Sequence, residues 1–96
     1  MDKIRRKTVD ELFEAIMTLR DLDEFYAFFE DVCTIKEILD IAGRFEVAGL
    51  LDEGRNYSQI SALTGASTGT ISRVNKALGY GAGGYRIALD RRKKDE

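Results

Sequence analysis

The sequence predicts an all-α protein of about six helices, folded as a single domain. Apolar residues recur at helical spacing along most of the chain, and 96 residues suffice for one small core. A threonine followed by a glutamate three positions later, which is typical of helix starts, opens two of these helices. No proline is present to interrupt a helix from within. The expected helices span residues 9–20, 24–32, 34–53, 58–64, 68–78 and 85–94.

Two capping boxes are expected at the starts of the first and third helices. In each, the threonine hydroxyl accepts a hydrogen bond from a backbone N–H three residues later, and the glutamate reaches back to the threonine N–H. The pairs are Thr8 with Glu11 and Thr34 with Glu37. Breaks are expected at residues 21–23, 54–57 and 79–84, the last being too rich in glycine to stay helical.

Residues 58–78 predict two short helices that cross at a tight turn. Gly65 stands where the backbone must turn sharply, Ser61 is small where the helices cross, and the Ser67 hydroxyl can cap the second helix. This is the helix-turn-helix layout, whose second helix enters the major groove of DNA. The alternative is an ordinary αα-hairpin with a glycine turn. The apolar positions that let the helices pack are Ile60, Ala66, Ile71 and Val74.

The start of the second helix carries side chains suited to DNA. Thr68 and Thr70 each offer a hydroxyl for a base edge and a methyl group for thymine, and Gly69 allows close approach. Lys76 is expected to contact phosphate, whereas Arg73 could serve a phosphate, a ligand or a surface ion pair. The candidate DNA-binding residues are Ser58, Gln59, Ser67, Thr68, Gly69, Thr70, Ser72, Arg73 and Lys76. For Ser67 the alternative is a pure capping role, and for Ser72 a solvated side chain.

The charges are distributed unevenly along the chain. Residues 1–54 hold 7 Lys and Arg against 14 Asp and Glu, whereas residues 55–96 hold 8 against 3. The expected DNA-reading helix therefore lies in a basic half, which favours double-stranded DNA as the partner. A basic C-terminal group either adds salt-sensitive attraction to DNA or only solubilises the chain. This group is Arg86, Arg91, Arg92, Lys93 and Lys94.

The composition argues against several other classes of protein. Without histidine and with Cys33 as the single cysteine, the chain lacks the usual catalytic and zinc ligand sets, so we expect neither an enzyme nor a metal site. No apolar run approaches the roughly 20 residues that span a bilayer, so no membrane partner is expected. Residues 1–7 are basic but do not lead into the apolar stretch of a signal peptide. We expect a cytoplasmic protein.

The helices before residue 54 carry more apolar surface than one small subunit can bury. Four phenylalanines and several aliphatic residues fall on more than one helix face, which favours a partner chain, most simply a second copy. A symmetric dimer also suits a helix-turn-helix protein, because two copies address two half-sites. The alternative is a helical, homodimeric interaction module without specific DNA binding. The phenylalanines are Phe13, Phe25, Phe28 and Phe29.

The long helix that begins at Thr34 and the segment 65–73 resemble the Trp repressor, and more closely its Gram-positive relatives of the YerC/YecD type. The segment Ser67-Thr-Gly-Thr-Ile-Ser-Arg-Val-Asn-Lys-Ala-Leu-Gly-Tyr-Gly81 is similar to that group, and the resemblance covers about residues 8–95. It implies an intertwined homodimer. Residues 8–53 would form the shared dimerisation helices, 58–78 the helix-turn-helix and 85–94 the C-terminal helix.

The same resemblance implies candidate effector residues. In the Trp repressor, tryptophan lies between two arginines, and Arg44 and Arg73 match those positions, while Thr34 matches a threonine near the ligand's amino end. The alternative for Arg44 is an intrahelical pair with Asp40. Val74 stands where the repressor has glycine against the ligand ring, so its branched side chain is expected to fill the slot. We therefore expect no resident cofactor. Whether a small-molecule co-regulator exists stays open at this point, and tryptophan is not the expected one.

Overall fold

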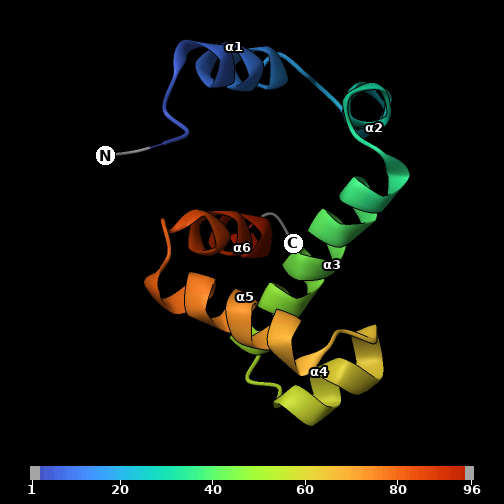
Figure 1. The fold of residues 1–96 in the computed structure, drawn as a ribbon, viewed down its shortest axis with the longest axis vertical. Helices are drawn as coiled ribbons and strands as arrows, with labels where there is room; N and C mark the ends of the chain where they lie inside the picture. Colours follow the sequence, from blue (N-terminus) through green and yellow to red (C-terminus); the bar gives the residue numbers. More distant parts are fainter. Residues whose placement is uncertain (1–2, 95–96) are drawn as a thin grey trace. The chain divides into compact units, whose positions relative to one another are not determined.

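The computed structural model describes residues 3–94, which form six α-helices and no strand, so the prediction of an all-α chain with about six helices is confirmed (Figure 1). The described residues form two compact units, residues 3–38 and 39–94, and the boundary lies within α3. The helices are α1 (Lys7–Ile16), α2 (Leu22–Val32), α3 (Ile35–Asp52), α4 (Tyr57–Thr64), α5 (Thr68–Tyr80) and α6 (Gly84–Lys94). Predictions that touch residues 1, 2, 95 and 96 lie outside the described residues.

The first helix begins earlier and ends sooner than the sequence predicted. The Arg6 carbonyl accepts hydrogen bonds from the N–H groups of Val9 and Asp10 at 3.1 and 3.0 Å, so Thr8 lies inside the first turn. No side chain caps this helix, and the predicted capping box of Thr8 is wrong. The helix ends at Ile16 and not near residue 20, because the chain continues into i→i−3 turn bonds.

The starts of α2 and α3 are fixed by side-chain caps. Asp21 accepts from the Glu24 N–H at 2.9 Å, and Glu24 accepts from the Arg20 N–H at 2.8 Å, so α2 begins two residues before its predicted start. At α3 the predicted box is confirmed: Thr34 Oγ1 accepts from the Glu37 N–H at 3.1 Å, and Glu37 accepts from the Thr34 N–H at 2.8 Å. The bond from the Thr34 backbone N–H, aided by the Thr34 side chain, lowers the pKa of Glu37.

The N-terminal unit, residues 3–38, exposes most of its apolar side chains. No described residue of α1 or α2 is buried. The Phe29 ring stacks on Phe25 at 6.3 Å between centroids and meets Phe28 edge-on at 5.4 Å, yet Phe25 remains 38% exposed. Contacts within this unit therefore leave a large apolar surface open to solvent.

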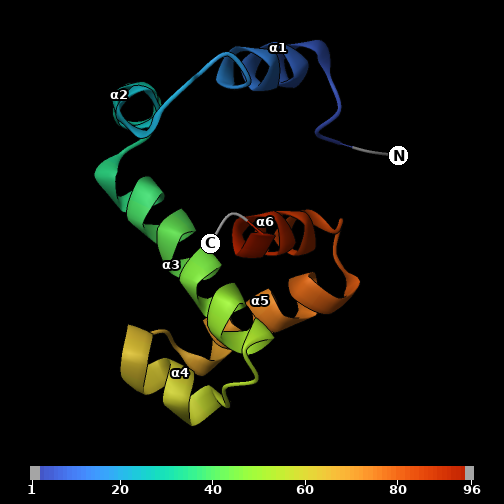
Figure 2. The ribbon, with the colours of Figure 1, turned by 180° about the vertical axis from the view of Figure 1, so that it is seen from behind.

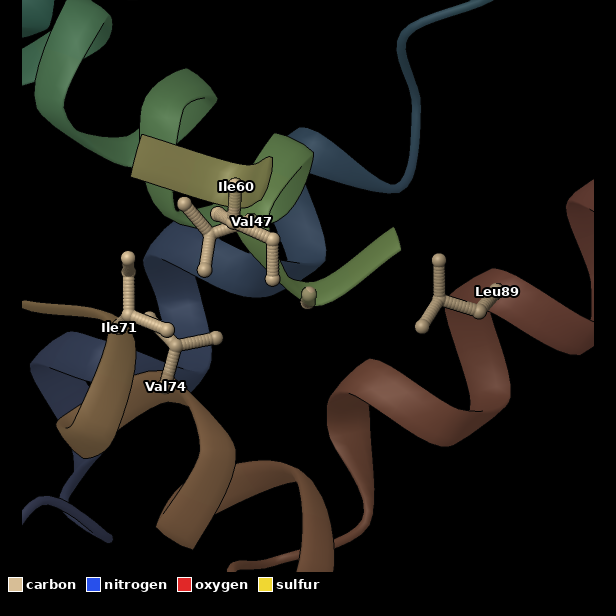
Figure 3. Packing of buried hydrophobic residues seen from close by; sticks show 6 residues of the cluster. Val47, Ile60, Ile71, Val74 and Leu89 are labelled. Carbon is tan, nitrogen blue, oxygen red and sulfur yellow. The ribbon is translucent and has the colours of Figure 1, made fainter. Parts of the chain in front are cut away.

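The core of the structure lies in the C-terminal unit, where α3, α4, α5 and α6 each contribute (Figure 3). The predicted packing of Ile60, Ile71 and Val74 is confirmed, since each is at most 2% exposed. Val47 and Leu89 were absent from the predicted core, although both are buried. The buried cluster is Val47, Ala48, Ile60, Ile71, Val74 and Leu89.

Helix α5 is longer than predicted. Gly79, expected in a loop, is helical, and a Cβ at this position would meet nothing within 4 Å. The helix stops at Gly81, whose N–H donates to the Ala77 carbonyl at 2.8 Å and where a Cβ would collide with that carbonyl. Gly83 then adopts a φ of 88°, and α6 follows. Both views place α4 and α6 on opposite sides of α5 (Figure 2).

Candidate nucleic-acid interface

The first helix of the pair, α4, is held by a capping box that the sequence analysis did not identify. Asn56 Oδ1 accepts from the Gln59 N–H at 2.8 Å, and Gln59 Oε1 accepts from the Asn56 N–H at 3.0 Å. The spacing of Asn56 and Gln59 is the sequence signal for this box, and Asn56 lies within the break predicted at residues 54–57. Gln59, predicted to contact phosphate, thus uses its carbonyl oxygen within the helix start, while Ser58 stays exposed.

The turn between α4 and α5 has the predicted geometry. Gly65 adopts a left-handed φ of 76°, and its N–H donates to the Ser61 carbonyl at 2.8 Å. The Thr64 hydroxyl donates to the Ile60 carbonyl at 2.7 Å and accepts from the Ala66 N–H at 3.1 Å. A Cβ at Gly65 would meet nothing within 4 Å, so backbone conformation, and not lack of space, favours glycine here.

Ser67 caps α5, as predicted. Its Oγ accepts from the Thr70 N–H at 3.2 Å and donates to Thr70 Oγ1 at 3.1 Å. Thr70 is half-buried, whereas Thr68, Gly69 and Ser72 are exposed. A Cβ at Gly69 would approach only Ser67 Oγ, at 3.9 Å, so glycine leaves this side of the helix start bare and open to a close partner.

Tyr57 and Asn75, which were not among the predicted site residues, connect the two helices of the pair. Asn75 of α5 donates to the Tyr57 hydroxyl of α4 at 3.3 Å, which links the two helices outside their core. Tyr57 also lines a hollow that runs along α4 and reaches the start of α5, together with four other residues. They are Ser58, Ser61, Ala62 and Thr68. Because this contact joins residues 18 positions apart, no local pattern indicated it.

The two cations selected from the sequence, Arg73 and Lys76, are exposed on α5. Together with Thr68, Gly69 and Ser72 they present polar and basic groups from one helix, and the backbone N–H groups at its start favour an anion. This combination can contact base edges and phosphates of duplex DNA. Two basic residues of α6 are arranged differently, because Arg86 Nη2 donates to Asp52 Oδ1 at 2.7 Å and Lys93 contacts the other Asp52 oxygen.

The carboxylate of Asp52 is held in its charged form by these contacts. The hydrogen bond from Arg86, followed by that from Lys93, lowers the pKa of Asp52 to about 2. The same contact with Asp52, together with the bond to Asp90, raises the pKa of Arg86.

The candidate effector residues are distributed over both units. Thr34 caps α3 in the N-terminal unit, and Arg44 and Arg73 are exposed on α3 and α5 of the C-terminal unit. Val74, the residue after Arg73, is 2% exposed and packs in the core with Val47 and Ile71. The branched side chain of Val74 therefore packs into the core on the buried side of α5.

Comparison with known proteins identifies the family. The family model described as Trp repressor protein matches residues 7–93. The chain belongs to the Trp repressor family. Its members are regulatory DNA-binding proteins and not enzymes. Among relatives, the uncharacterized protein YerC of Bacillus subtilis is 53% identical over 96 residues, covering 100% of this chain and 92% of that protein.

Two crystal structures of this family have closely similar folds. A TrpR-like protein from Eubacterium eligens aligns with a TM-score of 0.91 at 55% identity, covering 95% of this chain and 94% of that one. A candidate Trp repressor from Staphylococcus aureus aligns with a TM-score of 0.91 at 44% identity, covering 95% and 91%. None of the helices in residues 3–94 has the length and apolar character needed to cross a membrane.

Proposed function

We propose that this chain is a cytoplasmic transcription regulator that binds specific duplex DNA as a homodimer, most simply as a repressor. The exposed start of α5 carries the proposal. Its first residues, Thr68, Gly69 and Ser72, are small and exposed, so this end of the helix can enter the major groove. Further along the same helix, the exposed Arg73 and Lys76 can contact phosphate. Caps at both helices and the fixed Gly65 turn hold this helix start rigid, which lowers the entropic cost of binding.

The homodimer is proposed from the N-terminal unit. The apolar side chains of this unit are largely exposed. A dimer interface that covered them would stabilise the assembly by about 25 cal/mol for each Å² of apolar surface buried. Exposed apolar residues with at least half of their surface accessible lie in all three of its helices. They include Phe13 (53%), Met17 (82%), Leu22 (72%), Tyr26 (60%), Val32 (55%) and Ile35 (76%).

DNA binding is further proposed not to require tryptophan. The Trp repressor has glycine where this chain has Val74, and the burial of Val74 leaves less room for an indole ring beside Arg73. A co-regulator of another shape would use Arg44 and Arg73, which are both exposed in the C-terminal unit. A thermal-shift screen of amino acids and indoles tests this: stabilisation that is lost in Arg44→Ala supports a pocket, whereas stabilisation by tryptophan contradicts the proposal.

Selection of bound sequences from randomised duplex DNA tests the main proposal. We expect a symmetric pair of half-sites about one helical turn apart. The double variant Thr68→Ala/Arg73→Ala should lose DNA retention while keeping the mass of the dimer. Thr18→Ala/Arg20→Ala is a matched control, because it removes the same two residue types from exposed positions of the N-terminal unit.

The second candidate function is an interaction module without specific DNA binding, which the exposed apolar surface of the N-terminal unit favours. The same experiment separates the two. Recovery of no preferred sequence, or equal DNA retention by both double variants, would favour the interaction module and show that α5 is not the DNA-reading helix.

A further inference from the structure

The basic residues of α6 are not equivalent in the structure. Arg86 and Lys93 both contact Asp52, at 2.7 and 2.5 Å, and Arg86 also donates to Asp90 at 3.0 Å. Arg92 lies over the Phe45 ring, 6.0 Å from its centroid. Two further cations extend α6 toward its end, Arg91 and Lys94, and both are exposed without an ion pair to any carboxylate of residues 3–94.

Asp52 occupies a position that helix formation by itself disfavours. It is the last residue of α3, where a carboxylate interacts unfavourably with the negative end of the helix dipole. Its side chain is 12% exposed, whereas those of Arg86 and Lys93 are 44% and 57% exposed. The contacts with these two cations offset both the unfavourable interaction with the helix dipole and the cost of burying the carboxylate. Asp52 thereby neutralises positive charge on a surface that otherwise carries an excess of it.

The location of α6 gives this neutralisation a consequence for DNA binding. Because α4 and α6 lie on opposite sides of α5 (Figure 1), DNA attracted to α6 would lie away from the hollow that runs along α4 to the start of α5. Such binding depends on phosphates alone and is the same for every sequence. Specificity is the ratio of specific to non-specific affinity, so cations on α6 would lower it.

We infer that Asp52 is a specificity-determining residue, which engages Arg86 and Lys93 and so keeps these two cations from adding to sequence-independent DNA binding by α6. The inference rests on the proposed DNA-binding function. It concerns the balance between two binding modes and not the reading of bases by α5. Removal of the Asp52 charge should therefore strengthen binding to arbitrary DNA more than binding to the selected sequence.

The test measures affinity for a labelled duplex of random sequence between about 50 and 300 mM salt. The variant is Asp52→Asn, and its matched control is Glu53→Gln. Both changes remove one carboxylate, but the Glu53 side chain is 58% exposed and only 3.9 Å from Arg55, so its loss frees no cation of α6. Asp52→Asn should bind several-fold more tightly at low salt, with a slope of log K against log[salt] steeper by about 0.9 for each freed cation that meets a phosphate. Glu53→Gln should match the parent slope.

A second variant, in which Asp52, Arg86 and Lys93 are all replaced by neutral residues, tests the inference even if Asp52→Asn does not fold. Asp52→Asn/Arg86→Gln/Lys93→Gln removes the carboxylate together with the two cations that it engages, and its salt slope should equal that of the parent protein. Arg91→Gln/Lys94→Gln, which removes the two exposed cations, should flatten the slope. A flattened slope in the triple variant would show that Arg86 and Lys93 contact DNA in the parent protein and would overturn the inference.

The remaining outcomes separate this inference from the proposed function. If the parent protein binds DNA and Asp52→Asn behaves like Glu53→Gln, the role of Asp52 is wrong and the DNA-binding function stands. If neither the parent protein nor Asp52→Asn binds any duplex at low salt, the proposed function fails and the inference fails with it.

Discussion

Ser67 Oγ is bonded to Thr70 in two ways, accepting from its backbone N–H at 3.2 Å and donating to its hydroxyl at 3.1 Å. One serine therefore both caps α5 and orients the side chain of Thr70, which the sequence predicts as a DNA contact. Capping and function meet at this residue, and the two roles can be separated by comparing stability with DNA affinity.

Replacement of Ser67 should destabilise the protein and weaken DNA binding together. Ser67→Ala removes the cap and frees the Thr70 side chain, which should lower the free energy of unfolding by about 1 kcal/mol. In thermal melts, a loss of this size corresponds to a Tm about 4–8 °C lower. Ser58→Ala is the control, since Ser58 is exposed within the first turn of α4 and its loss should change stability by less than about 0.5 kcal/mol. Equal effects of the two changes would contradict the capping role.

The same substitution should have opposite effects at two glycines. Gly65→Ala places a Cβ at a φ of 76° and should cost about 1–2 kcal/mol of unfolding free energy. Gly79→Ala should instead stabilise by about 0.5–1 kcal/mol, because Gly79 is helical and a Cβ there meets nothing within 4 Å. Urea unfolding at fixed protein concentration measures both. A stabilised Gly65→Ala protein would show that the turn does not need the left-handed conformation.

Local features of the helix-turn-helix could be predicted from the sequence because their partners lie within three or four residues. The Gly65 turn and the Ser67 cap are of this kind, as is the Thr34 box. Thr8 shows the limit of such patterns: the spacing to Glu11 is correct, but the helix begins before it, at Lys7. A capping pattern states which residues can cap a helix, but it does not fix the residue at which the helix begins.

Contacts between distant parts of the chain could not be predicted. Asp52 lies 34 residues from Arg86 and 41 from Lys93, and Tyr57 lies 18 residues from Asn75. Each depends on how α3, α4, α5 and α6 pack, and no local pattern encodes it. The cations of α6 were consequently treated as one basic group, whereas the structure divides them by their partners.

Stability should fall at acidic pH through Asp52. Its pKa is about 2 in the folded protein against an ordinary value of 3.8, so the charged form is favoured by folding. The resulting stabilisation is complete above about pH 4 and is lost as the pH falls toward 2. Urea unfolding of the parent protein and Asp52→Asn over pH 2–5 should give a difference in unfolding free energy that shrinks as pH falls. A difference that is constant over this range would show that Asp52 is not held by Arg86 and Lys93.

Neighbouring residues of α5 should separate stability from function. Val74 is 2% exposed, so Val74→Ala should lower the free energy of unfolding by about 2 kcal/mol through lost apolar burial and the cavity left behind. Arg73 is exposed, and Arg73→Ala should leave stability nearly unchanged while weakening DNA binding and its salt dependence. Thermal melts and DNA titrations of both variants provide the comparison. Loss of stability in Arg73→Ala would indicate a structural role for the arginine.

A charge placed on the N-terminal unit should break the proposed dimer. Leu22 is 72% exposed, and in an isolated subunit Leu22→Glu would cost little. In a dimer whose interface covers this residue, the same change buries an unpaired carboxylate and should dissociate the subunits. Sedimentation at micromolar concentration should therefore give the dimer mass for the parent protein and the monomer mass for the variant.

Leu63→Glu controls for the general effect of replacing an exposed leucine by glutamate. Leu63 is 59% exposed on α4, within the helix-turn-helix, so the dimer mass should persist. Two results would contradict the proposed interface. A parent protein of monomer mass would remove the dimer itself, and dissociation by Leu63→Glu but not Leu22→Glu would place the contact between subunits on α4. Because both variants lose the same side chain and gain the same charge, only the location of the interface can distinguish them.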